Sequence, residues 1–370
     1  TFFPVCYMML KGLLKNIDPS LEEAARDMGA SRFKVFSSVT LPLILPGLGN
    51  AFLVTFIESI ADFANPMIIG GSYDTLATTI YLQITGAYDK EGAAAMAVVL
   101  LTITLMMYLV QKYVLEAKTA ATLTGKASRA RMLIEDRSVT IPLTILCSLI
   151  ALFVIMMYIC VPFGALFNTW GYDFTLTTKW FVRVFEKYKG FKAFRDSFLL
   201  SLASAPITAL LSMIISYLVV KRKFKAKGFI EFVSMLAMAV PGTVLGISYV
   251  LGFNAIEIFG RTFSLSGTAA ILVIVFTFRN MPVAIESGTT TLLQIDNSIE
   301  EASTILGADT GYSFRRITLP LLRNAFFSGI VYSFTKAITA VSAVIFLVSP
   351  RWNLVTSKIY TLFDQAKYSM

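Results

Sequence analysis

The sequence contains no histidine and only three cysteines among its 370 residues. Without histidine the chain lacks the commonest general base and the commonest metal ligand of proteins. The cysteines, Cys6, Cys147 and Cys160, are far apart and lie in apolar surroundings. This pattern fits neither a zinc spacing nor a disulfide framework, so we interpret them as packing residues and expect no metal site and no cofactor.

The chain also lacks the motifs of a nucleotide-using enzyme. Gly125-Lys126 has no upstream glycine at the spacing of a G-x-x-x-x-G-K-[ST] phosphate-binding loop. No set of nucleophile, base and orienting residue is visible. Aromatic residues make up 13% of the chain, but they lie in apolar runs and at their edges, not interleaved with a basic face. We therefore expect neither an enzyme nor a nucleic-acid-binding protein, and any ATP-driven activity would need a separate subunit.

Charge is scarce and apolar sequence is abundant. The chain is 15% charged and 56% hydrophobic, with a mean hydropathy of +0.70, which is typical of a membrane protein. The net charge of +9 is consistent with basic cytoplasmic loops. The apolar runs predict one partial span over residues 1–10 and seven complete spans, over residues 47–69, 93–115, 141–166, 197–220, 229–253, 267–285 and 324–348.

One stretch of the sequence occurs twice. LEEAARDMGASRFKVFSSVTLP at residues 21–42 returns as IEEASTILGADTGYSFRRITLP at residues 299–320. Adding 278 to a position in the first copy gives its equivalent in the second, with no gap. An ungapped match of this length indicates a duplicated unit.

Each copy predicts a helical hairpin. Ser20 with Glu23, and Ser298 with Glu301, have the spacing of a capping box at a helix start. Gly29 and Gly307 stand where a left-handed turn would end that helix, and a second amphipathic helix is expected to begin at about residue 31 or 310. A hydrophobic run follows within a few residues of each closing Leu-Pro.

The spacing Glu-Ala-Ala (or Ser), three residues, Gly, nine residues, Val or Ile, any residue, Leu-Pro resembles the EAA motif of binding-protein-dependent ABC importer permeases of the type I fold. That resemblance implies an all-α membrane protein with two homologous transmembrane halves related by a pseudo-twofold axis, in the bacterial inner membrane. It implies two ATPase subunits on the cytoplasmic side and an extracytoplasmic substrate-binding protein as partners. The residues it assigns to ATPase coupling are Glu23, Ala24, Ala25, Gly29, Glu301, Ala302, Ser303 and Gly307. For the two glutamates, helix capping alone is the competing interpretation.

The repeat divides the chain. Residues 1–115 are expected to be the C-terminal part of the first permease half, with its motif loop at 10–45. Residues 116–140 form a basic cytoplasmic linker, and residues 141–370 the second half, with its loop at 286–323. The first copy enters late, and residues 353–360 resemble residues 75–82, which precede a span. We therefore expect the sequence to begin inside the first half and to end before the last helix of the second.

Charge supports a cytoplasmic position for both motif loops. Alternation of the spans gives cytoplasmic segments with 19 Lys and Arg and outer segments with 11, the sign expected from the positive-inside rule. The exception is the outer segment 168–195, with six basic residues and several aromatic ones. We interpret this segment as a surface helix at the membrane interface.

Five residues are candidates for lining a pathway. Pro241 and Gly242 should kink or interrupt the span 229–253, and freed backbone at that depth must face protein or water; a packing kink is the alternative. Glu58 and Lys336 differ by 278 and so occupy equivalent positions in the two halves, where opposite charges would pair across the axis or flank the pathway. Asp62, one turn beyond Glu58, is expected to share its face. The alternative is that Glu58 lies near the cytoplasmic boundary and snorkels.

Three segments of the second half resemble one branch of this permease family. AVPGTVLGISYVLGF, FRNMPVAI and AVSAVIFLVSP are similar to the fused permeases of ferric-iron uptake. Related permeases carry thiamine, phosphonates, polyamines, sulfate or molybdate. A secondary transporter or channel also uses internal repeats and broken helices, but it has no need of twin docking hairpins. A membrane-embedded enzyme has only scattered carboxylates in its favour.

Overall fold

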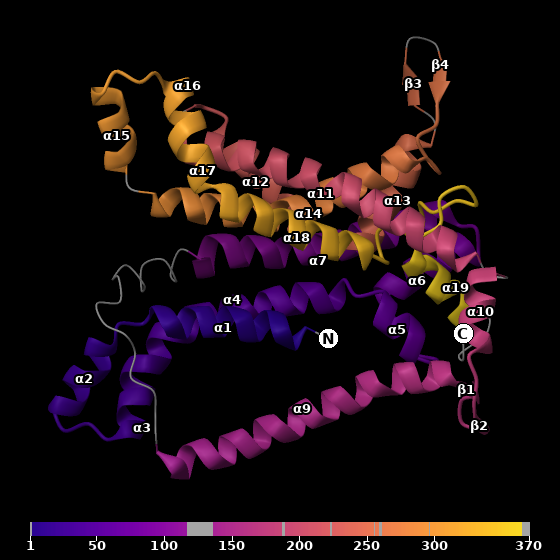
Figure 1. Ribbon diagram of the computed structural model, residues 1–370, viewed down its shortest axis with the longest axis horizontal. Helices are drawn as coiled ribbons and strands as arrows, with labels where there is room; N and C mark the ends of the chain where they lie inside the picture. Colours follow the sequence, from indigo (N-terminus) through magenta and orange to yellow (C-terminus); the bar gives the residue numbers. More distant parts are fainter. Residues whose placement is uncertain are drawn as a thin grey trace. The chain divides into compact units, whose positions relative to one another are not determined.

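The computed structural model describes residues 2–116, 136–186, 189–222, 224–254, 256–258, 261–295 and 297–364. Residues 117–135 of the predicted linker 116–140 lie outside the described residues, and residues 137–140 already belong to the helix α9 (Arg137–Leu166). The chain is mainly helical (Figure 1) and divides into two compact units. Unit 1 contains Thr1–Ala61 and Thr102–Arg183, and unit 2 contains Asp62–Leu101 and Val184–Lys367.

Unit 1 carries the first copy of the repeat. Its helices are α1 (Phe3–Asn16), α2 (Pro19–Asp27), α3 (Arg32–Val35), the π-helical turn η1 (Phe36–Thr40), α4 (Leu41–Ile60), the end of α7 (Lys90–Val110), a second π-helical segment η2 (Gln111–Glu116) and α9 (Arg137–Leu166). α1 and η2 both pack on α4. Gly47 permits the close approach of α1, because a Cβ there would lie 2.2 Å from the Leu13 Cδ1 atom.

Unit 2 carries the second copy. It contains α5 (Ala64–Ile69), α6 (Leu76–Thr85), the start of α7, α11 (Gly190–Lys221), α12 (Lys227–Ala239), α13 (Gly242–Phe253), α14 (Ala269–Gln294), α15 (Asn297–Ile305), α16 (Thr310–Ser313), η3 (Phe314–Thr318), α17 (Leu319–Leu321), α18 (Arg323–Ile338) and α19 (Val355–Asp364). A two-stranded antiparallel hairpin, β3 (Ile256–Ile258) with β4 (Arg261–Phe263), joins α13 to α14.

The core of unit 2 is the bundle of α11, α14 and α18, which lie side by side (Figure 1). α11 buries a stripe of serine, alanine and threonine, and such small residues let membrane helices approach closely. Two of the serines bond across the interface: the hydroxyls of Ser212 and Ser216 donate to the Met281 and Ile285 carbonyls at 3.2 and 2.8 Å. These bonds hold α14, and with it the second motif hairpin, against α11.

The duplication extends beyond the motif. α6 and α19 are both ten residues long, and each end of one is 279 residues from the matching end of the other. Their equivalent tyrosines, Tyr81 and Tyr360, meet edge to face at 5.7 Å between ring centroids, and Phe63 and Phe346 pack against them. The equivalence of these two helices is therefore one residue out of register with the similarity between residues 75–82 and 353–360, which has an offset of 278.

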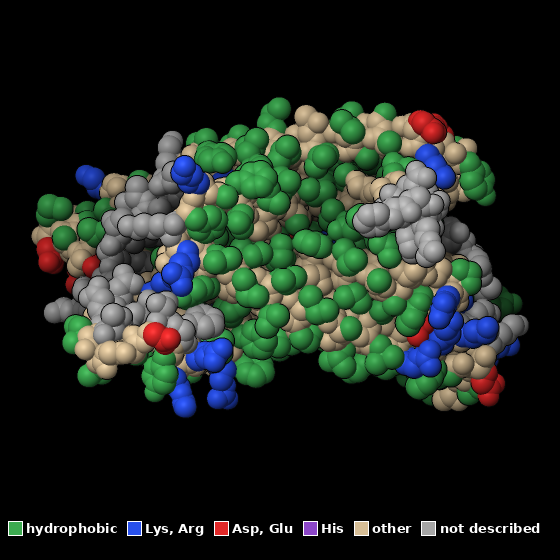
Figure 2. All heavy atoms as spheres, turned by 90° about the horizontal axis from the view of Figure 1, so that it is seen from above, with side chains coloured by type: hydrophobic (Ala, Val, Ile, Leu, Met, Phe, Trp, Pro, Cys, Tyr) green, Lys and Arg blue, Asp and Glu red, His purple; other side chains and the backbone are tan. Residues whose placement is uncertain are grey.

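The structure contains five helices long and apolar enough to cross a membrane, counted over the described residues: Arg32–Ile60, Lys90–Leu115, Arg137–Leu166, Gly190–Lys221 and Ala269–Leu293. Apolar side chains dominate the surface drawn in Figure 2, as expected for helices that face lipid. The predicted spans 47–69 and 324–348 were wrong in their outer ends. α4 stops at Ile60 and α18 at Ile338, again 278 residues apart.

Polar residues explain the break after α4. Asp62 lies just past the helix end, and its carboxylate accepts a bond from the Asn65 side-chain amide at 2.6 Å, at the start of the separate helix α5. After Ile338 the chain forms turns, and the Thr356 hydroxyl donates to the Ala340 carbonyl at 2.7 Å. A hydropathy profile does not show either break, because the residues beyond each break are apolar again.

The segment predicted as one surface helix over residues 168–195 was also wrong. It contains a β-hairpin, β1 (Phe167–Thr169) with β2 (Asp173–Leu176), then the short helix α10 (Lys179–Glu186), and from Gly190 it already belongs to α11. Gly171, at φ +82°, lies in the hairpin turn. The Trp180 indole donates to the Phe167 carbonyl at 2.8 Å and so holds α10 on the hairpin.

Candidate functional site: the repeated hairpins

Each motif hairpin turns at the predicted glycine. Gly29 has φ +84° and Gly307 has φ +83°, so both left-handed turns are confirmed. In the first copy the Gly29 amide donates to the Arg26 carbonyl at 2.8 Å and the Ala30 amide to the Ala25 carbonyl at 3.1 Å. This pair of bonds is a Schellman motif. The second copy has the equivalent long bond, from the Ala308 amide to the Ser303 carbonyl, also at 3.1 Å.

The start of the first hairpin differs from the predicted capping box. Asp18 caps α2, and its carboxylate accepts the Ser20 amide at 3.0 Å, so that Ser20 is the second residue of the helix. Aspartate caps as well as serine, and Pro19 suits the first helical position because it has no amide hydrogen to lose. In the second copy α15 begins at Asn297, so Ser298 also lies inside the helix.

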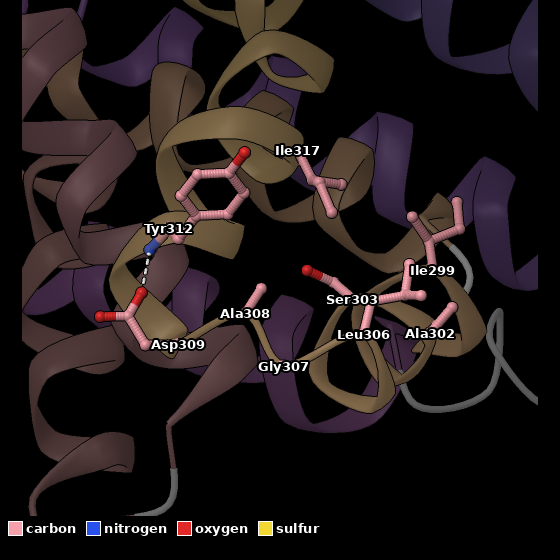
Figure 3. Close-up of a pocket in the computed structure, with 9 residues that line it drawn as sticks. All are labelled: Ile299, Ala302, Ser303, Leu306, Gly307, Ala308, Asp309, Tyr312 and Ile317. Atoms are coloured by element: carbon pink, nitrogen blue, oxygen red, sulfur yellow. Dashed lines mark hydrogen bonds between the residues drawn. The ribbon is translucent and has the colours of Figure 1, made fainter.

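The second helix of each hairpin begins at equivalent residues. The Ser31 hydroxyl accepts the Lys34 amide at 3.4 Å, and the Asp309 carboxylate accepts the Tyr312 amide at 2.7 Å (Figure 3). The predicted starts near residues 31 and 310 are confirmed. Five residues later both copies widen into the π-helical turns η1 and η3, which again are 278 residues apart.

The residue pair buried inside the hairpin is apolar in the first copy and polar in the second. In the first copy Ala25 and Val35 are both buried. In the second their equivalents are Ser303 and Ser313, which are also buried and share a hydrogen bond of 2.7 Å between hydroxyl oxygens. An apolar pair has thus been exchanged for a satisfied polar pair. Ala25 and Ser303 are therefore interior positions of the hairpins.

The tips of both hairpins are open and apolar. Met28 is 82% exposed and its equivalent Leu306 is 87% exposed, although both are large hydrophobic side chains. Glu23, Ala24 and Ala302 are exposed as well; the side chain of Glu301 lies outside the described residues. In the second tip Ile305, next to Leu306, is 85% exposed as well, and adjacent exposed apolar residues indicate an interaction surface.

The second hairpin holds an open groove of about 750 Å³ (Figure 3). It lies between α15 and α16 and is lined by Ile299, Ala302, Ser303, Leu306, Gly307, Ala308, Asp309, Tyr312 and Ile317. Most of these side chains are apolar, and Asp309 is the acidic one. Three of the residues assigned to coupling, Ala302, Ser303 and Gly307, therefore meet in one groove.

Two contacts of the first hairpin were not predicted. The Thr40 hydroxyl, inside η1, donates to the Glu22 carboxylate at 2.8 Å, so the glutamate that ties the hairpin together is Glu22 and not Glu23. Arg32 pairs with Asp136, the cap of α9, at 2.6 Å between Nη1 and Oδ2. Hydrogen bonds from Ser138 and Arg32 lower the pKa of the Asp136 carboxyl to about 2. The run Glu22-Glu23 could have signalled the first contact, and the Asp136-x-Ser138 cap sequence could have signalled an acid at that helix start.

The charged pathway candidates lie at helix ends. Glu58, half-buried, is the third residue from the end of α4, and Lys336, exposed, is the third from the end of α18. Both ends are opposite to the hairpin ends of these helices, and the position of Glu58 relative to the cytoplasmic boundary stays a prediction. Asp62 follows the end of α4, so the expectation that it shares a helix face with Glu58 was wrong.

The break at Pro241 and Gly242 is confirmed. α12 and α13 meet there at 110°. A Cβ on Gly242 would lie 1.9 Å from the Arg279 Nη1 atom and 2.2 Å from the Ser342 hydroxyl. Any larger residue would therefore require the Arg279 and Ser342 side chains to move where the chain passes between α14 and the segment after α18. Arg279 was visible in the sequence as a lone cation within an apolar run.

Among the residues that the structure describes, no group of three or more cysteine, aspartate or glutamate side chains is placed to hold a metal ion. The site is a pair of equivalent hairpins, each of which leads into a helix of its own compact unit.

Comparison with known families identifies the class. The family model described as the binding-protein-dependent transport system inner membrane component matches residues 1–118 and 208–364. The chain belongs to this family and is a multi-pass inner-membrane protein of the type I importer fold. Both hairpins fall within the matched residues, whereas α9, the β1–β2 hairpin and α10 fall outside them.

Several individual permeases with a named cargo are similar to the chain. The chain is 33% identical to the ferric transport system permease protein FbpB of Actinobacillus pleuropneumoniae, over 100% of this chain and 54% of the relative. It is 34% identical to the putative ferric transport system permease protein FbpB 1 of Haemophilus influenzae, over 94% of this chain and 55% of the relative. The molybdate/tungstate permease WtpB of Methanocaldococcus jannaschii is 32% identical over 42% of this chain. The chain spans about half the length of the ferric relatives.

Proposed function

We propose that this chain is the membrane permease of an ATP-driven, binding-protein-dependent importer, and that both hairpins dock on ATPase subunits. The observation that carries the proposal is the matched pair of hairpin tips, in which Met28 and Leu306 are exposed at equivalent positions beyond identical glycine turns. A single exposed tip would be unremarkable. There are two equivalent tips, and each leads into a helix of its own compact unit. Two such tips are what two equivalent partner subunits would need as docking sites.

In this proposal the ATPase is a separate protein, and a substrate-binding protein delivers the cargo on the opposite face. Residues Glu23, Ala24, Ala25, Gly29, Glu301, Ala302, Ser303 and Gly307 form the coupling surface or its frame. The exposed members contact the ATPase, while Ala25 and Ser303 are buried and hold the hairpins in shape. The π-helical turn η1 then connects the first hairpin directly to α4, and η3 connects the second to α18 through α17 and a turn at Leu322.

The cargo is ferric iron in this proposal. The support is similarity: two relatives named as ferric transport permeases match nearly the whole chain, whereas the molybdate relative matches less than half of it. The alternatives within the same fold are thiamine, phosphonate, polyamines, and an oxyanion such as sulfate or molybdate. A secondary transporter or channel is the alternative from another class, and the hairpins argue against it.

The pathway is proposed to pass the broken helices. Pro241 and Gly242 would line it at the α12–α13 break, with Glu58, Asp62 and Lys336 near the ends of α4 and α18. Backbone left unpaired at such breaks is tolerated where it faces protein or a wet cavity. This role is independent of the cargo.

One experiment tests the proposal as a whole. The full-length permease, its candidate ATPase and its candidate binding protein would be reconstituted in vesicles, and uptake of radioactive ferric iron measured with and without ATP. ATP-dependent uptake that needs all three proteins supports the proposal. Uptake driven by an ion gradient without the ATPase would favour a secondary transporter, and ATP-dependent uptake of molybdate in preference to iron would replace the cargo.

A further inference from the structure

The helix α9 is long and apolar enough for its two ends to lie on opposite faces of a membrane. Its 30 residues contain no buried side chain, and its first residue follows Asp136, which contacts Arg32 of the first hairpin. A helix of this length rises about 45 Å, which exceeds the roughly 30 Å of bilayer hydrocarbon. The elements that follow Leu166 therefore lie at the membrane surface opposite the hairpin.

Those elements form an aromatic cluster, which consists of Phe163, Phe167, Trp170, Phe174 and Trp180. The Phe167 ring lies 6.0 Å from Phe163, 6.1 Å from Trp170 and 5.3 Å from Phe174, between centroids. The indole of Trp180 bonds to the Phe167 backbone. Around the cluster Tyr172, Leu176, Phe181 and Val182 are exposed. Aromatic side chains of this kind concentrate at membrane–water interfaces.

Two cations converge on one ring of this cluster. The Lys179 Nζ atom lies 4.4 Å from the Trp180 ring centroid, and the Arg183 Cζ atom lies 5.0 Å from it. They are four residues apart on α10, where like charges repel. Neither has an ion pair within the described residues of unit 1. An anion between them would remove the repulsion.

The nearby carboxylate does not fill that role. Asp173 accepts bonds from the Asn168 amide and from the backbone and hydroxyl of Thr175, and these bonds lower the pKa of Asp173. Lys179 contributes only the smallest of the influences on that pKa. The Asp173 charge is therefore satisfied within the β1–β2 hairpin, and the two cations remain available.

We propose that residues 167–183 bind a phospholipid of the bilayer leaflet opposite the first hairpin, with its phosphodiester between Lys179 and Arg183. The acyl chains would run along the exposed face of α9, and the exposed aromatic residues would lie at headgroup depth. An anionic headgroup is favoured over a zwitterionic one, because it brings no cation of its own to the Lys179–Arg183 site. This inference accounts for basic residues on a face where the charge rule predicts few.

The site lies outside both stretches that the family model matches, and it does not depend on the cargo or on ATPase docking. It is tested on the full chain in nanodiscs of phosphatidylcholine, doped with phosphatidylglycerol brominated on its acyl chains. Trp352→Phe leaves Trp170 and Trp180, both in the cluster, as the only indoles. We expect quenching of their fluorescence at low mole fractions of the brominated lipid, in excess of what random mixing gives.

The variant K179Q/R183Q should raise the mole fraction needed for half-maximal quenching roughly tenfold or more, since each Lys or Arg at an anionic surface contributes about fivefold in affinity. K179R/R183K should retain the parent behaviour. R351Q/K358Q, which removes two positive charges from another segment, is the matched control and should also behave as the parent.

Three results would overturn the inference. Absence of quenching by any brominated lipid would mean that the cluster lies outside the bilayer and is covered by something else, such as an acidic protein surface. Equal quenching by brominated phosphatidylglycerol and phosphatidylcholine, unchanged in K179Q/R183Q, would remove the phosphate contact. Relief of quenching by millimolar inorganic phosphate would show that a soluble anion, and not a lipid, occupies the site.

Discussion

Replacing the two turn glycines by valine should uncouple the permease without unfolding it. Gly29 and Gly307 have φ +84° and +83°, and a Cβ at either would meet no atom within 4 Å. The cost is therefore backbone strain alone, about 1–2 kcal/mol for a side chain in the left-handed region and at the upper end for a β-branched one. That strain lowers the population of the native turn by roughly 5- to 30-fold in each hairpin.

The strain acts on the hairpin tips and not on the membrane bundle. Losing the Schellman turn frees the Ala30 and Ala308 amides and allows each first helix to run on, which would carry Met28 and Leu306 away from their present positions. The penalties should add, because the two hairpins belong to different compact units. We expect G29V/G307V to insert normally and to lose most ATP-dependent uptake and ATPase co-purification.

Two variants control this experiment. Gly228 also has open space around its Cβ position but no positive φ, so G228V makes the same substitution without the strain and should transport normally. Gly29→Asn should fall between valine and the parent, because asparagine tolerates the left-handed conformation. Parental uptake and ATPase binding in G29V/G307V, or an equal loss in G228V, would refute the reasoning.

Three further predictions test other parts of the structure. Gly242→Ala should impair transport, because its methyl group would displace the Arg279 guanidinium and the Ser342 hydroxyl, whereas the methyl group of Gly252→Ala on the same helix meets no atom and should leave transport unchanged. Equal uptake in both variants would remove the steric argument. Ser303→Ala should destabilise the second hairpin by about 1–3 kcal/mol, since it leaves the buried Ser313 hydroxyl without its partner. Adding Ser313→Val should recover most of that loss, because the double variant recreates the Ala25–Val35 pair of the first copy. Local hydrogen exchange measures the stability of the hairpin in both variants, and additive losses would contradict an energetic coupling between the two serines. If Glu58 and Lys336 act together across the pathway, E58K and K336E should each impair uptake and the double swap should restore part of it; normal uptake in both single variants would dismiss the pair.

The parts of the structure that the sequence predicted are those set by local backbone chemistry. A glycine at the end of each repeated helix needs no tertiary information to be recognised as a left-handed turn, and an offset of 278 residues says that both turns are built alike. Pro241-Gly242 likewise carries its own backbone restriction. The helical class and the membrane location could also be predicted, because they depend on the overall composition and on the repeat and not on contacts between distant residues.

The features that were mispredicted are those for which the local sequence allows two structures of similar stability. Asp18 and Ser20 are both good helix caps, and only the proline between them favours the earlier start. The breaks after Ile60 and Ile338 are invisible to hydropathy, which averages over the polar residues that make them. The 168–195 segment has enough amphipathic residues for a helix, but Gly171 and the Trp180–Phe167 bond turn its first part into a β-hairpin.

Contacts that join distant parts of the chain could not be foreseen. The Glu22–Thr40 bond and the Arg32–Asp136 pair span 18 and 104 residues, and sequence spacing alone does not state which acid meets which partner. The groove beside Gly307 likewise depends on the angle between α15 and α16. These are the features of the candidate site for which the structure was needed.

The π-helical turns η1 and η3 allow the length of the chain between hairpin and membrane helix to change by one residue. In η1 the Leu41 amide donates to the Phe36 carbonyl, five residues back, so this turn holds one residue more than an α-helical turn. The helix on either side keeps its register across such a turn, so deleting a single residue within it would restore a regular helix and leave the hairpin facing the same way. Deleting a residue from the α-helical turns of α4 would instead rotate everything on one side by about 100°. The gene should therefore tolerate a single-codon deletion within residues 36–40 far better than one within α4, although both leave every side chain of the hairpin tip intact.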